Sequence, residues 1–125
     1  MNIAGVGDFS KRDDGWLASP DVLKGVPLKI ESEVISSGLI ERAQAICGRW
    51  GEILDVAMHF IEGQRREYEL SARLFFNPCV FIDSPENWAV YFDSGLDGES
   101  VVGVSFNLDQ PFELTIGDWS DCWEL

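Results

Sequence analysis

The chain has 125 residues, which is the size of one domain, and 46% of them are hydrophobic, including 5 Trp and 8 Phe. This content excludes an intrinsically disordered chain and allows a sizeable core without disulfides or metals. The net charge is −13, from 22 acidic and 9 basic residues. We therefore expect one acidic domain that spans residues 1–125.

The acidic residues are concentrated toward the C-terminus. Arg73 is the last basic residue, and ten acidic residues follow it. A surface of one sign argues against nucleic acid as a direct ligand, because phosphate binding needs Lys and Arg. It favours encounter with a basic protein partner through electrostatic steering. The alternative is that the charge only keeps the protein soluble.

The N-terminal residues 1–15 contain no apolar run of the kind a signal peptide needs. No stretch approaches the ~20 apolar residues of a membrane span. The three cysteines, Cys47, Cys79 and Cys122, are widely spaced and form no CxxC pair. We therefore expect a cytoplasmic protein with reduced thiols, no membrane contact, no metal site and no cofactor.

The N-terminal part reads as strand. Apolar and polar residues alternate over 26–33, with Leu28 and Ile30 on one face and Lys29 and Glu31 on the other. Residues 15–18 are a candidate pairing partner for this strand, and residues 19–21 read as a turn. The sequence therefore predicts an N-terminal strand or hairpin.

One long amphipathic helix is predicted next. Ser36 or Ser37 supplies an N-cap oxygen, and Gly63 is a natural C-terminal stop. Two glycines inside this segment, Gly48 and Gly51, predict a bend or a close approach to a strand. Apolar residues recur at three- and four-residue spacing between the caps, at Leu39, Ala43, Ile46, Trp50, Ile53, Leu54, Ala57 and Ile61.

The C-terminal half predicts a β-meander. Residues 67–75 alternate as a strand, although a continuing helix competes because Glu69 and Arg73 would pair at i, i+4. A short apolar run over 79–82 precedes strands at 88–93, 101–108 and 112–117, joined by short links rich in turn formers. We therefore expect an α+β domain in which one long helix packs against an antiparallel β-meander sheet.

Residues that could carry chemistry form no catalytic constellation. His59, the only histidine, has Asp55 and Glu62 at helical spacing, but no nucleophile can be assigned to it. A pair of carboxylates could also act as acid and base, but their spacing in the chain says nothing about their geometry. We therefore predict that the protein is not an enzyme, with His59 or a carboxylate pair as the enzymatic alternative.

The predicted partner-binding surface combines an acidic hairpin loop with the C-terminal tail. The loop could hold a hard cation but lacks the twelve-residue calcium pattern. Tryptophans are favoured interface anchors, and acidic neighbours suit a basic partner, although both tail tryptophans could instead pack back onto the domain. The predicted partner-binding residues are Asp93, Asp97, Glu99, Asp109, Asp118, Trp119, Asp121 and Trp123.

The chain also resembles a family of small, uncharacterised bacterial cytosolic domains. The residues that carry the resemblance are Gly7, Trp16, Tyr91-Phe92-Asp93, Gly95, Gly98, Ser100-Val101-Val102 and Gly117. This sequence departs from the family at Glu99, where the family pattern has histidine. The family is similar to the immunity proteins of polymorphic and contact-dependent toxin systems.

The resemblance implies an immunity-type inhibitor that covers the active site of a basic toxin, such as a nuclease, with an acidic surface. The alternative from the residues is a self-associating structural or regulatory domain, a homodimer paired through a sheet edge.

Overall fold

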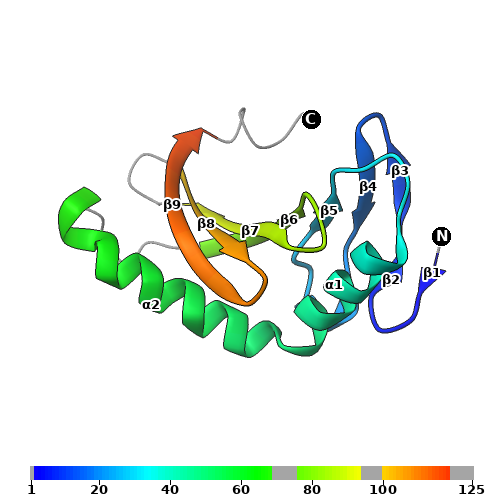
Figure 1. The fold of residues 1–125 in the computed structure, drawn as a ribbon, viewed down its shortest axis with the longest axis horizontal. Coiled ribbons are helices and arrows are strands. Elements are labelled where there is room, and N and C mark those ends of the chain that lie inside the picture. The colour runs from blue at the N-terminus through cyan, green and yellow to red at the C-terminus, as the bar shows by residue number, and fades with distance from the viewer. Residues whose placement is uncertain (1, 69–75, 94–99, 119–125) are drawn as a thin grey trace.

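The computed structural model of the chain describes residues 2–68, 76–93 and 100–118. Two helices and two β-sheets make up these residues (Figure 1). In chain order the elements are β1 (Asn2–Ile3), β2 (Gly7–Asp8), β3 (Ser10–Arg12), β4 (Gly15–Ala18), the 3-10 helix η1 (Asp21–Leu23), β5 (Leu28–Ile30), α1 (Ser37–Gly48), α2 (Trp50–Tyr68), β6 (Phe76–Ile82), β7 (Asn87–Asp93), β8 (Ser100–Asn107) and β9 (Gln110–Asp118).

The main sheet has seven strands in the order β3-β4-β5-β6-β7-β8-β9, while β1 and β2 form a separate small hairpin. The predicted pairing of residues 15–18 with the following strand is confirmed as β4 with β5, and β6 to β9 form the predicted antiparallel meander. The expectation of a purely antiparallel sheet is wrong, because β5 and β6 pair in parallel. The two helices carry the chain back across the sheet between these strands, as a parallel pair requires.

The predicted single long helix is two helices. The Ser36 side chain accepts the backbone N–H of Leu39, which confirms a predicted N-cap. Helix α1 ends at Gly48, and the backbone of the next residue, Arg49, leaves the helical region at φ −126° and ψ 25°. The break lies between Gly48 and Gly51, where a bend was predicted, and these residues favour it because glycine is a poor helix former.

The predicted helix stop at Gly63 is wrong. Gly63 lies inside α2, which continues to Tyr68, and it does not adopt the positive φ of a helix-ending glycine. A predicted strand over 67–75 is therefore wrong at Glu67 and Tyr68, where the competing helix is observed. The rest of that segment, 69–75, lies outside the described residues.

The core lies between the helices and one face of the sheet, here called the inner face. The strand register aligns two buried rows across this face. The rows are Leu28, Val80, Val90, Val104 and Leu114, and Ile30, Ile82, Trp88 and Phe106. The helices contribute buried residues at the predicted spacing, namely Leu39, Ala43, Ile46, Ala57 and Ile61.

The opposite face of the sheet, here called the outer face, carries the alternate residues of the same strands. Lys29, Phe81, Ala89 and Ser105 align across it. The prediction placed Lys29 on the polar face of a half-buried strand, and the structure has it on that face with an exposed fraction of only 6%. Its ammonium nitrogen lies 3.0 Å from a carboxylate oxygen of Asp14, so the buried charge is paired.

Candidate functional site

Two carboxylates meet where the parallel strands end. Ile30 of β5 and Ile82 of β6 are register partners, so the next residue of each strand, Glu31 and Asp83, leaves the sheet at the same edge. The Glu31 backbone N–H donates to the Ile82 carbonyl at 2.9 Å, which continues the ladder beyond the strands. Parallel pairing therefore brings together two acidic residues that lie far apart in the sequence.

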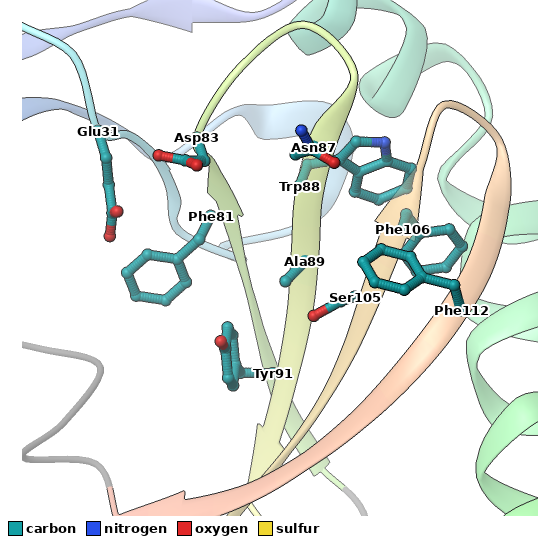
Figure 2. Close-up of a pocket in the computed structure, with 10 residues that line it drawn as sticks. All are labelled: Glu31, Phe81, Asp83, Asn87, Trp88, Ala89, Tyr91, Ser105, Phe106 and Phe112. Carbon is teal, nitrogen blue, oxygen red and sulfur yellow. The ribbon is translucent and has the colours of Figure 1, made fainter.

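Glu31 and Asp83 line a cavity of about 430 Å³ on the outer face. Figure 2 shows both carboxylates on one side of the cavity, near Phe81, with Ala89 and Ser105 between the flanking aromatic side chains. The hollow exists because the central strands carry small residues at these positions. The full lining is Glu31, Phe81, Asp83, Asn87, Trp88, Ala89, Tyr91, Ser105, Phe106 and Phe112.

Aromatic rings form the walls of this cavity. On the outer face, Phe81 and Tyr91 meet edge to face with ring centroids 5.3 Å apart. Trp88 and Phe106 also border the cavity, but their rings are buried in the inner-face row, where they stack at 4.1 Å. Phe112 is 55% exposed, which is unusual for so large an apolar side chain. The cavity therefore combines apolar walls with a charged end, as ligand sites commonly do.

Gly103 gives the Tyr91 ring its position. Tyr91 and Gly103 are register partners on β7 and β8, and a Cβ atom at residue 103 would overlap the Tyr91 ring. A glycine in a strand interior often marks such a close approach. Any larger residue at this position would move the ring and change the wall of the cavity.

The turn after β6 fixes the Asp83 end of the cavity. The backbone N–H groups of Asp83 and Ser84 both donate to the Asn87 carbonyl at 3.0 Å, and the Ser84 hydroxyl accepts the Asn87 backbone N–H at 3.1 Å. From α1, the Arg42 Nε donates to the Pro85 carbonyl at 2.8 Å. The turn is therefore held both from within and by a helix on the inner side.

The electrostatics of the site oppose ionisation of Glu31. Burial raises the pKa of Glu31, and the nearby carboxylates of Asp83 and Asp14 raise it further, while the Lys29 ammonium lowers it. Lys29 in turn donates to Asp14, and this hydrogen bond lowers the pKa of Asp14. The net effect is a raised pKa, so a cation bound beside Glu31 would favour its charged form.

The predicted partner-binding residues that the structure describes lie at opposite ends of the sheet. Residues Asp93 and Asp118 end β7 and β9 at one end of the sheet, and Asp109 follows β8 at the other. The exposed Asp109 carboxylate lies 3.3 Å from the Arg42 guanidinium and 3.6 Å from that of Arg49, so cations of the same chain already engage it. Five further predicted residues lie outside the described part of the chain: Asp97, Glu99, Trp119, Asp121 and Trp123.

The residues considered for catalysis do not meet in a site. His59 is exposed on α2, its Nδ1 lies 2.8 Å from the Asp55 carbonyl of the same helix, and it lines neither described cavity. Burial raises the pKa of the Cys47 thiol to about 11, far from that of a reactive thiolate. Within the described residues no group of three or more His, Cys, Asp or Glu side chains is arranged to hold a metal ion.

A second cavity, of about 780 Å³, lies against the N-terminal hairpin. Its lining comes from residues 2–8, β3, β4 and η1, and includes Asp8, Arg12 and Asp21. Charges of both signs line it, and most of the remaining lining is small side chains. Its chemistry therefore favours no particular ligand.

No family model, curated protein or solved structure matches the chain in sequence or fold comparisons. Within the described residues no helix is both long enough and apolar enough to cross a membrane.

The cavity was missed by reasoning from the sequence, although parts of its signal are present there. Gly103 interrupts an alternating strand, and Phe112 follows a proline at the start of another. Glu31 and Asp83 lie side by side because β5 and β6 pair in parallel, and the alternation of residues within one strand does not reveal this pairing.

Proposed function

We propose that the protein is a binding domain for a basic protein partner, which it recognises with the outer face of the sheet, and that it acts as an immunity-type inhibitor of a basic toxin. The observation that carries the proposal is the cavity that pairs Glu31 and Asp83 with aromatic walls. None of the residues described in its lining is basic. A basic surface would complement it in charge.

Three cations among the described residues are engaged in ion pairs within the chain. Lys29 pairs with Asp14, Arg42 with Asp109, and Arg49 with both Glu52 and Asp109. A third acidic residue of the outer face, Glu113, is exposed on β9 opposite Ser105. The outer face therefore presents carboxylates whose complement a partner has to supply.

The immunity-type role draws on the charge of the whole chain and on the family resemblance. Toxin nucleases are commonly basic, and the net charge of −13 suits such a target. An inhibitor of this kind needs no chemistry of its own, since covering an active site is sufficient. Acidic residues would speed the encounter, while aromatic side chains such as Phe112 would anchor it.

The test begins with the partner itself. Tagged protein is used to capture partners from its native cells at low and high salt, and a stoichiometric basic partner is then purified and its affinity measured by calorimetry. Glu113→Lys on the outer face should weaken that binding, whereas Glu41→Lys on the exposed side of α1 should not. Equal effects of the two substitutions, or binding that ignores salt, would count against an acidic outer-face interface.

Self-association has one observation in its favour. Within the described residues β9 is the last strand of the sheet, it is nine residues long, and Phe112 on it is exposed. Such an edge can pair with a second copy. Pro111 and Glu113 oppose this, because a proline lacks the N–H donor and charges discourage edge pairing. Sedimentation velocity at micromolar concentration distinguishes the two: a dimer dispersed by Phe112→Lys would favour self-association.

A further inference from the structure

We infer that the cavity of the outer face receives one arginine side chain of the basic partner. This inference rests on the proposed function and specifies how the partner is recognised. The cavity of about 430 Å³ is large enough for one long side chain, with apolar walls along its length and two carboxylates at one end.

The carboxylate end suits a guanidinium group. Glu31 and Asp83 emerge from neighbouring parallel strands at the same register level, and Figure 2 shows both side chains bordering the same end of the cavity. A guanidinium presents five N–H donors in a planar fork, so it can donate to two carboxylates at once. Asp14 already holds the nearby Lys29 ammonium at 3.0 Å, and none of the ion pairs within the described residues involves Glu31.

The aromatic walls favour arginine over lysine. A flat, weakly hydrated guanidinium stacks on aromatic rings, whereas an ammonium loses a strong hydration shell when it enters an apolar space. Phe81 and Tyr91 are fixed in an edge-to-face pair, and Gly103 leaves room for the Tyr91 ring. The methylene stem of arginine would contact Phe81 and Ala89 while its head lies between the carboxylates.

The ionisation of Glu31 also favours an arginine side chain as the ligand. The groups that face Glu31 are Asp83, Asp14 and Lys29, and the two carboxylates together with burial keep its pKa raised. A bound guanidinium would lower that pKa, so binding should release protons. By linkage, affinity for a cation should then rise as the pH rises through the raised pKa of Glu31.

The experiment uses the full chain and a small probe in place of the partner. Nα-acetyl-arginine N-methylamide is titrated into 15N-labelled protein, with the isosteric but neutral citrulline compound and the lysine compound as comparisons. The expected result is saturable millimolar binding of the arginine probe, with amide shifts centred on Phe81, Ala89, Tyr91 and Ser105. Binding of the lysine probe should be weaker, and the citrulline probe should not bind.

Substitutions then separate this pocket from general attraction to an acidic protein. Glu31→Gln and Asp83→Asn preserve shape and should together weaken the arginine probe by about three- to tenfold, as expected for two partly exposed ion pairs. The control Glu41→Gln removes the same charge from α1 and should leave affinity unchanged. The spectra of the variants report directly whether they are folded.

Three results would overturn the inference: citrulline binding as tightly as arginine, lysine binding equally well, or shifts centred on the second cavity near Gly7. These outcomes are separable from failure of the proposed function. If Glu113→Lys weakens the partner but the arginine probe does not bind the cavity, the outer face is an interface without an arginine pocket. If the probe binds as expected but no basic partner depends on the outer face, the pocket stands and the protein-binding role fails.

Discussion

Replacing Arg42 with methionine should lower the free energy of unfolding by about 2–4 kcal/mol. Arg42 extends from α1, its side chain is 13% exposed, and it reaches two turns of the sheet at once. Its Nε donates to the Pro85 carbonyl at 2.8 Å, its guanidinium lies 3.3 Å from Asp109, and it stands 5.8 Å from the centroid of the Trp88 ring. Methionine keeps the apolar stem but loses all three polar interactions.

The magnitude follows from these contacts. A hydrogen bond from a charged donor contributes about 1.5–3 kcal/mol and a cation–π contact at a partly exposed site about 0.5–1 kcal/mol. The ion pair with Asp109, which is 58% exposed, adds at most about 1 kcal/mol because water screens it. These contributions share one side chain and overlap, so we expect about 2–4 kcal/mol rather than their full sum.

Urea unfolding at neutral pH measures the effect. With a slope of about 2 kcal/mol per molar urea, the midpoint should fall by roughly 1–2 M at unchanged slope. Asp109→Asn is the matched control, because it removes only the exposed ion pairs of Asp109 with Arg42 and Arg49 and should cost less than about 1 kcal/mol. The reasoning would be refuted if Arg42→Met cost less than about 1 kcal/mol, or if Asp109→Asn cost as much as Arg42→Met.

Three further predictions concern the site and the core. Gly103→Ala should displace the Tyr91 ring and weaken arginine-probe binding while the sheet stays folded; ring contacts in NMR spectra that match the unaltered protein would contradict the geometry. Folding raises the pKa of Glu31, so its contribution to stability is complete below the ordinary value of 4.5 and is lost as the pH rises through the folded pKa. Urea unfolding at a series of pH values should therefore show the unaltered protein losing stability relative to Glu31→Gln over that range. Cys47 and Cys79 are buried, and with the third cysteine replaced by serine they should react with a thiol reagent only as fast as the domain opens; rapid reaction in the native state would show that they are accessible.

Elements with strong local signals could be predicted from the sequence. The N-cap at Ser36 follows from a side-chain oxygen before an apolar repeat, and the strands of the meander follow from alternation between turn residues. The course of α2 through Gly63 could not be predicted in this way, because a glycine in a helix costs only ~1 kcal/mol relative to alanine and packing against the sheet outweighs it.

The site could not be predicted for a different reason. Charge and tryptophan content directed attention to the C-terminal residues, of which Asp109 is engaged by Arg42 and Arg49. The cavity instead depends on the parallel pairing of β5 with β6, which sets Glu31 beside Asp83. Alternation shows which residues share a face of one strand, but it does not show which strands are neighbours.

The arrangement of charges bears on whether the acidity of the chain serves only solubility. Glu31 and Asp83 are both exposed and contribute to solubility, but a solubility role does not require them to lie together beside an apolar cavity, where partial burial and repulsion both oppose ionisation of Glu31. A cationic side chain of a partner would favour the ionised form of Glu31. The repulsion that destabilises the free protein would then be relieved in the complex, and this relief would add to the affinity. Glu31→Gln should therefore stabilise the free protein at neutral pH and at the same time weaken arginine binding. Under the solubility explanation, neither Glu31→Gln nor Glu41→Gln should change the affinity for arginine. A Glu31→Gln variant that is more stable but binds arginine more weakly would therefore favour the binding explanation.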